Sequence, residues 1–421
     1  MRTSLARSRL GSFDLLLLCA AIATACVRAL IATGMGDYPG DAGPALTAIA
    51  HGNVSGFFSH QPAMGALSLF VRVPFVLIGG ALRDSPMGLY RWGDLPCLLA
   101  VALVGVWLAR VARDHGTSRV GQAVIVAVCL LNPLINDALY YGHPEELLTA
   151  SFAVGALLAA AERRPLLAAV LVGCAVASKQ WGLVIVCPVL LTCERRRLRS
   201  AFVMAGVAAG ATLPMVVGNF HAFIHALHYI SRPQGVTTVF TWLYPLTPRG
   251  RVRIANIFGA PRVFQGHTVP ALIGVASHPV IIALGLVIPL LVFFRDRRRL
   301  TPDRMLLAAA LVLLLRCVLD PGSAGYYHLP LLLALLAGDA VAGRALPLLG
   351  LAGFAGAFTV LDRFVNYSST PVANSLYIAC TLIAALLLVR RLASGERGLD
   401  RLASGSQRIG ELAGVTATGP S

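Results

Sequence analysis

Residues 165–193 read PLLAAVLVGCAVASKQWGLVIVCPVLLTC, an apolar run with arginines on both sides. Arg163 and Arg164 precede it, and an arginine cluster at 195–199 follows it. Because clustered arginines mark the cytoplasmic side, the chain must cross the membrane an even number of times between them. A single helix would be about 43 Å long, too long for one crossing and short for two. We therefore expect two short helices that meet at residues 178–180, in the outer half of the membrane.

The composition of the whole chain is that of a membrane protein. Of its 421 residues, 57% are hydrophobic and 13% are charged, whereas a soluble globular chain is about 25% charged. The net charge of +16 does not indicate nucleic-acid binding, because the basic residues stand at the ends of apolar runs, where they set topology. The nine cysteines fall almost entirely within apolar runs and form no CxxC pair, so we expect neither a disulfide framework nor a zinc site.

The arginine rule leads to about twelve membrane-spanning helices. Three apolar runs lie between Arg9 and Arg110, where only an even number of crossings is allowed. The run at 63–82 carries Arg72 in its middle and is broken by Pro74, so we expect it to lie in the outer interface. The remaining spans are expected at 13–33, 93–111, 120–138, 146–161, 165–193 (twice), 200–218, 279–294, 305–319, 327–342, 345–361 and 372–389.

The expected fold is all-α, a polytopic membrane helical bundle with juxtamembrane helices in its first outer loop. One integral membrane domain covers residues 1–392, with both termini cytoplasmic and a long extracytoplasmic loop at 219–278. The start of the chain looks like a signal peptide, but its apolar stretch continues to Ala32, so we expect an uncleaved first span. The Gly/Ser/Ala-rich tail at 393–421 is expected to be disordered.

The first outer loop contains two acidic residues, Asp37 and Asp41, within GDYPGDAGP at 36–44. Polar groups that a membrane protein keeps at such a face are functional candidates. Asp41 also precedes a possible helix over 42–51, where it would serve as the N-cap, and the two roles are compatible. His60, and Arg91 at the outer end of the second span, belong to the same group of candidates.

The second outer segment reads YYGHPEE at 140–146. Acidic residues favour a helix N-terminus, which explains one glutamate. Because one would suffice, Glu145 and Glu146 together with His143 indicate a functional site. A short outer turn at 320–328 adds Tyr327 and His328 as candidates.

Lys179 is the only lysine among the 35 basic residues. A lysine at this depth must reach the interface or form an ion pair. A compact point charge suits a phosphate group, which is the reading we favour. The alternative is an ion pair with Glu145, Glu146 or Asp320.

The loop at 219–278 holds five arginines, five histidines and no acidic residue. Something anionic must compensate this charge, either lipid headgroups or a phosphate ligand held by arginines. Arg249, Arg251 and Arg253 are the candidates for the second role. No metal-ligand partners accompany the histidines, so we expect no metal site and no cofactor; a divalent cation is possible but not indicated.

Four pieces of the sequence, in this order, resemble the GT-C superfamily of membrane glycosyltransferases, which use polyprenyl-phosphate sugars. They are GDA at 40–42, HQPAMG at 60–65, YRW at 90–92 and ASKQWGLVIVCP at 177–188, and the last is similar to the polyprenol-phosphate-mannose-dependent branch. The resemblance covers residues 10–200. It implies that Asp41, or Asp37 in another register, is the catalytic base, and that Lys179 and Arg91 lie near the lipid phosphate. The chain departs from the pattern in having His-Gln-Pro in place of His-Pro-Pro and no adjacent acidic pair in its first loop.

The expected function is that of an inverting glycosyltransferase in the bacterial inner membrane, with its site on the extracytoplasmic face. It would move mannose or arabinofuranose from a polyprenyl-phosphate donor to a cell-envelope glycan or glycolipid, with membrane lipid around it and no nucleic-acid partner. A carboxylate would deprotonate the acceptor hydroxyl, and cations would stabilise the departing phosphate. The alternative is a transporter or lipid flippase, which usually shows repeated halves and facing broken helices. A third reading, a non-catalytic assembly subunit, predicts no lipid-sized groove beside Asp41.

Overall fold

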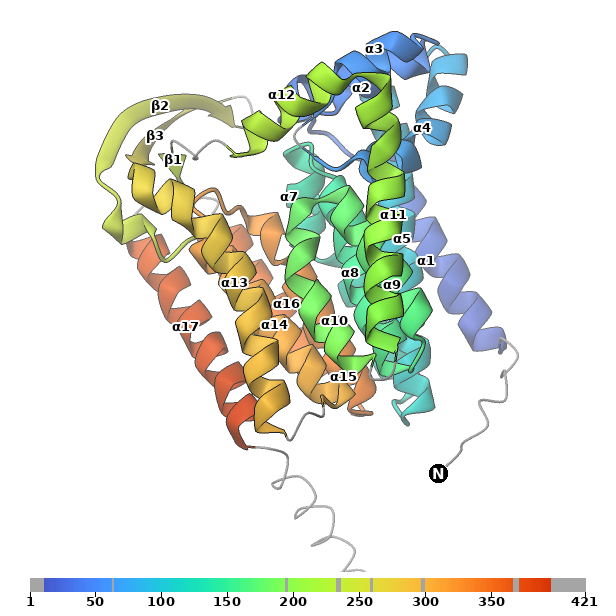
Figure 1. Cartoon of the computed structure of the whole chain (residues 1–421), viewed down its shortest axis with the longest axis vertical. Helices are drawn as coiled ribbons and strands as arrows, with labels where there is room; N and C mark the ends of the chain where they lie inside the picture. Colours follow the sequence, from blue (N-terminus) through green and yellow to red (C-terminus); the bar gives the residue numbers. More distant parts are fainter. Residues whose placement is uncertain are drawn as a thin grey trace, which may run out of the picture.

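The computed structural model of the chain is a helical bundle, and it describes residues 11–62, 64–193, 196–231, 236–257, 260–296, 300–365 and 371–394 (Figure 1). The tail expected to be disordered lies beyond these residues, except for its first two positions. Among the described residues, six helical segments are long and apolar enough to cross a membrane. They are α1 (Ser12–Leu30), α5 (Pro86–Asp114), α6 with α7 (Arg119–Leu131 and Pro133–Tyr140), α11 (Arg197–Gly218), α13 (Ala271–Arg295) and α17 (Pro371–Ser394).

Shorter helices complete the bundle. They are α8 (Glu145–Ala161), α9 (Pro165–Ser178), α10 (Val186–Thr192), α14 (Pro302–Leu319), α15 (Leu329–Val341) and α16 (Leu348–Gly356), which continues as the π-helix η6 (Ala357–Val365). Nearly every residue of α8 is buried, so this helix lies at the centre of the bundle. The expected polytopic helical bundle is confirmed.

The run at 165–193 forms two helical segments, as its flanking arginines require. Helix α9 ends at Ser178, and Lys179 adopts an extended backbone with φ −153° and ψ 141°. A 3-10 helix, η2 (Gln180–Ile185), then leads into α10. Lys179 therefore stands at a break between helices, where its side chain is not confined to a helix face.

The run at 120–138 lies in one segment long enough to cross the membrane, as expected, but the helix is interrupted within it at Asn132. Asn132 accepts a hydrogen bond from the backbone N–H of Ile135 through Oδ1 (3.3 Å) and so caps α7. Its amide also donates to the carbonyls of Val128 and Cys129 at the end of α6 (both 2.9 Å). One side chain thus satisfies groups of both helices, and Pro133 at the first position of α7 prevents α6 from continuing.

One end of the bundle carries the short elements of the first loop, and we call it the site end. These elements are η1 (Tyr38–Gly40), α2 (Gly43–Ala50), α3 (Val54–Ser59) and α4 (Ala66–Ala81), joined there by α12 (Phe220–Ser231) (Figure 1). Helix α1 begins and α17 finishes at the opposite end. The run at 63–82 therefore becomes a short helix beside the first-loop helices, and both described termini lie at one end, as the arginine pattern predicts.

The segment at 219–278 contains structure that the sequence did not indicate. Strands β1 (Val236–Thr237), β2 (Arg249–Ile257) and β3 (Ala260–Thr268) form an antiparallel sheet in the order β1-β3-β2. Helix α13 begins at Ala271 and passes through Pro279, so the apolar run starts earlier than the expected residue 279. The long loop is therefore a helix and a hairpin followed directly by a membrane-length helix.

Candidate active site

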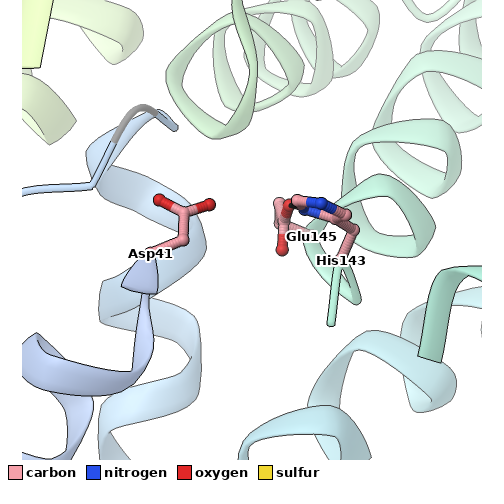
Figure 2. Close-up of side chains that lie close together, drawn as sticks. All are labelled: Asp41, His143 and Glu145. Atoms are coloured by element: carbon pink, nitrogen blue, oxygen red, sulfur yellow. Dashed lines mark hydrogen bonds and ion pairs between the residues drawn. The ribbon is translucent and has the colours of Figure 1, made fainter. Parts of the chain in front are cut away.

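Asp41 stands at the junction of η1 and α2, with its carboxylate facing the turn before α8 (Figure 2). Each of Asp41, His143 and Glu145 offers a polar atom, and these atoms lie within 4.8 Å of one another. The expectation that Asp41 caps α2 is wrong, because the N-cap residue is Ala42 and it has no side-chain cap. The helix over 42–51 is confirmed as α2, and Asp41 directs its carboxylate into the cluster instead.

Two glycines allow these distant segments to interlock. Gly36 has φ +26°, and a Cβ there would lie 2.2 Å from the Tyr141 carbonyl oxygen. Gly142 has φ +83°, and a Cβ there would lie 2.5 Å from the Met35 carbonyl oxygen. A backbone hydrogen bond also connects the two segments, because the Asp37 N–H donates to the Tyr141 carbonyl at 2.9 Å. The first loop and the 141–144 turn can approach this closely only because both positions lack a side chain and tolerate positive φ.

His143 links the two acidic segments. Its Nδ1 lies 2.9 Å from Glu145 Oε1, and its Nε2 lies 3.2 Å from Asp37 Oδ2. Burial by itself lowers the pKa of His143, but the Glu145 carboxylate and the hydrogen bonds to Asp37 and Glu145 raise that pKa to about 9. The imidazole is therefore charged at neutral pH and donates from both nitrogens.

Lys179 forms the ion pair that the sequence left as the alternative reading. Its Nζ lies 2.9 Å from Glu146 Oε1 and 3.2 Å from Glu145 Oε1, and both glutamates are completely buried. The indole N–H of Trp181 donates to Glu146 Oε2 at 2.9 Å. These contacts account for the two adjacent glutamates, since neither acts as a helix cap. A phosphate-binding role for Lys179 stays a prediction.

Arg316 in α14 is the second cation of this group, and it was missed from the sequence. Its Nη2 lies 3.2 Å from Glu146 Oε1, and its guanidinium lies over the rings of Trp181 (4.4 Å) and Tyr327 (4.5 Å). Lys179 and Arg316 together balance Glu145 and Glu146. An arginine inside the apolar run 305–319 was the available signal, because charged residues within a span are functional candidates by default.

The other predicted residues differ in their positions. Tyr327 belongs to the cluster, with its ring 5.9 Å from Lys179 Nζ. His328 is buried elsewhere, where its Nε2 lies 2.9 Å from the hydroxyl of Tyr377 in α17. His60 and Arg91 both contact backbone: His60 Nδ1 lies 2.8 Å from the Gly56 carbonyl oxygen of α3, and Arg91 donates to the Ala32 carbonyl just beyond the end of α1.

Arg249, Arg251 and Arg253 lie on β2, but their side chains fall outside the described part of the structure. Figure 1 places the β2–β3 hairpin over the ends of α13 and α17, away from α2 and α3. The backbone thus does not bring this group of arginines next to Asp41.

A largely apolar pocket adjoins the break at Lys179. It has a volume of about 160 Å³ and is formed by α4, α9, η2, α11 and α12, which makes it smaller than the roughly 300–1,000 Å³ usual for ligand pockets. Gln61 at its edge donates to the carbonyls of Met215 (2.9 Å) and Asn219 (3.1 Å) at the end of α11. The glutamine of the His-Gln-Pro segment therefore fastens the first loop to α11, with bonds that a proline could not donate.

The cluster also has the donor set for a divalent cation. Two carboxylates and an imidazole suit ions such as Mn²⁺ or Zn²⁺. Because the pKa of His143 is raised to about 9, an ion that bound this imidazole at neutral pH would have to displace a proton from it.

Comparison with known proteins places these observations in a family. The sequence model described as glycosyltransferase family 87 matches residues 67–321, which is more than half of the chain. The crystal structure of ArnT from Cupriavidus metallidurans bound to undecaprenyl phosphate resembles this chain with a TM-score of 0.46 and 19% identity, over 89% of this chain and 69% of ArnT. A likeness of that degree carries no inference about activity. No curated protein matches the sequence.

Proposed function

The chain belongs to glycosyltransferase family 87, and from this premise we propose that it transfers a sugar from a polyprenyl-phosphate donor to a hydroxyl group of its acceptor, with inversion. The observation that carries the proposal is the meeting of Asp41, His143 and Glu145 at the site end of a membrane bundle. The apolar pocket beside Lys179 supports a lipid donor, because its apolar lining suits the first isoprenoid units of such a donor next to the charged cluster.

In this proposal Asp41 is the general base. Its carboxylate is half-buried, which lets it contact a substrate while it remains partly shielded from bulk water. The side chain of Asp37 is 77% exposed and hydrogen-bonds His143, so it suits a role as the partner that orients and charges the imidazole. A correctly placed base takes the proton from the acceptor hydroxyl as the new glycosidic bond forms.

The departing lipid phosphate needs positive charge. His143 supplies it on the Asp41 side of the cluster, and Lys179 supplies it beside the pocket, where Gln180 is one of the lining residues. Cations placed where negative charge develops lower the barrier. We propose on this basis that transfer proceeds without a metal ion or other cofactor.

The sugar, acceptor and location follow the superfamily resemblance. We propose mannose or arabinofuranose as the sugar and a cell-envelope glycan or glycolipid as the acceptor. The protein would lie in a bacterial inner membrane with its site end extracytoplasmic and both termini cytoplasmic.

The test uses the full chain in lipid nanodiscs, with polyprenyl-phosphate mannose and arabinofuranose labelled in the lipid as donors, a cell-envelope glycolipid extract as the acceptor, and acceptor-dependent release of labelled polyprenyl phosphate as the readout. Asp41→Asn should slow release by roughly 100- to 10,000-fold, the usual contribution of a general base. Asp84→Asn is the matched control, because Asp84 accepts a hydrogen bond from Trp92 at the site end, apart from the cluster. Full activity in folded Asp41→Asn protein would refute the catalytic assignment, and use of nucleotide sugars alone would refute the donor.

A further inference from the structure

A fully buried ion pair lies close to the cluster and takes no part in the chemistry proposed above. Arg72 in α4 and Asp94 in α5 are both completely buried, with Nη2 and Oδ1 3.9 Å apart. That separation is longer than a hydrogen bond. Among the described residues, none of the guanidinium nitrogens of Arg72 has a hydrogen-bond partner. Because burying two ions costs several kcal/mol each in real proteins, a loosely paired couple is a poor stabilising device.

Arg72 contacts the element that carries Asp41. Its guanidinium lies 5.4 Å from the ring centroid of Tyr38, the buried residue of η1. The Tyr38 carbonyl in turn accepts a hydrogen bond from the Asp41 backbone N–H at 3.2 Å. Arg72 is thus two contacts away from the base: guanidinium to ring, and the same tyrosine's carbonyl to Asp41.

Tyr38 also contacts the other half of the site. A Cβ on Gly142 would lie 3.0 Å from the Cβ of Tyr38, so the turn that carries His143 packs directly on this residue. On its inner side, the Tyr38 ring packs against Tyr90 with centroids 4.8 Å apart. Tyr90 hydrogen-bonds the Leu139 carbonyl near the end of α7. Tyr38 is therefore the shared support of both acidic segments.

We propose that Arg72 and Asp94 are positioning residues for Asp41, and that they act through Tyr38. The Arg72 guanidinium holds the Tyr38 ring by a cation–π contact, and the Asp94 carboxylate holds that guanidinium between α4 and α5. Loss of the pair would let η1 shift relative to the 141–144 turn. A misplacement of about 1 Å can cost on the order of 100-fold in rate, so a small shift of Asp41 is sufficient. The inference rests on the proposed function only for its kinetic readout.

The experiment compares Arg72→Met, Asp94→Asn, the double variant and Tyr38→Leu in the full chain. Each single variant of the pair leaves one buried charge without its partner, so both should unfold at lower temperature than the parent. The double variant removes both charges and should recover most of that loss. Its kcat for donor turnover should still fall by about tenfold or more at unchanged KM, and Tyr38→Leu should do the same with the pair intact.

Two further measurements separate positioning from general damage. The control Arg113→Met/Asp14→Asn removes another Arg–Asp pair, between α5 and α1, and should keep the parent kcat. Carbodiimide labelling of Asp41, quantified by mass spectrometry, should rise in the double variant and in Tyr38→Leu, whether or not the donor is correctly identified. A parent chain that releases no polyprenyl phosphate from the donors would refute the proposed function alone. Parent-like labelling and kcat in the folded double variant, or in Tyr38→Leu where the double variant does not fold, would overturn the positioning role.

Discussion

Replacing Lys179 by methionine tests whether this side chain neutralises the buried glutamates as well as supplying charge to the donor phosphate. Methionine keeps an unbranched apolar stem of similar length and removes the charge. It leaves Glu145 and Glu146, both fully buried, with Arg316 and the imidazolium of His143 as compensation. We therefore expect a large loss of stability, larger than any loss of packing would explain.

The magnitude follows from the contacts of Lys179. Its ammonium lies 2.9 Å from one carboxylate oxygen and 3.2 Å from another, and an effective dielectric constant near 20 makes each attraction worth roughly 5 kcal/mol before desolvation is subtracted. Breaking a buried pair by removing one partner typically costs about 3–5 kcal/mol, and we expect that range. Lys179→Met/Glu146→Gln restores the balance of charge, and the glutamine oxygen still accepts from Arg316 or Trp181. Most of the lost free energy should therefore return.

The assay is unfolding by sodium dodecyl sulfate titration of the purified protein, with donor turnover measured in parallel. Arg164→Met is the control, because Arg164 forms a 3.4 Å surface pair with Glu162 and is 59% exposed; a change of at most about 1 kcal/mol is expected. A Lys179→Met protein as stable as the parent, with a raised KM for the donor, would refute the neutralising role and favour the phosphate reading.

Three further predictions concern pH, metal and packing. The stability contributed by the His143 imidazolium is fully present below a pH of about 6.5 and is lost as the pH rises through its folded pKa of about 9. The unfolding midpoint of the parent should therefore decrease as the pH is raised from about 7 to about 10, and that of His143→Gln should not. Donor turnover should persist in excess EDTA, since the imidazolium supplies the charge an ion would bring; activity lost to EDTA and restored by Mn²⁺ would contradict this. Gly65→Ala should prevent stable folding, because its Cβ would lie 2.1 Å from the Ala177 carbonyl oxygen, whereas Gly206→Ala, in open space, should express normally.

Much of the fold could be predicted because charge and hydropathy report directly on membrane crossing. The arginines around 165–193 required a break, and the structure has it at Lys179. The break at Asn132 was missed because it leaves no trace in hydropathy: the asparagine satisfies backbone groups of both helices, and the run stays apolar around it. The hairpin of β2 and β3 could not be predicted from hydropathy, because it lies between two apolar runs.

The site was harder to predict, because its residue types allow several partners. Asp41 was singled out in one segment and His143 with Glu145 in another, and the contact between the two segments depends on Gly36 and Gly142 permitting a close backbone approach. The sequence alone could not decide whether Lys179 pairs with a carboxylate or binds a phosphate, because either partner suits a buried lysine. Arg316 and Asp94 were overlooked although each is a charge within an apolar run. Whether such a charge supports a site or only a helix contact is decided by its neighbours in space.

The pairing of Arg316 with Glu146 spans 170 residues of sequence, and this separation has a consequence for biosynthesis. The ribosome releases α8, with two carboxylates in its first turn, long before it translates α14. During that interval Lys179 and His143 are the cations available to those carboxylates within the cluster. We expect nascent chains truncated before α14 to keep the start of α8 in contact with water and to be degraded early. Arg316, the last cation of the cluster to be translated, would then complete the folding of a site whose first carboxylates, Asp37 and Asp41, are translated near the beginning of the chain.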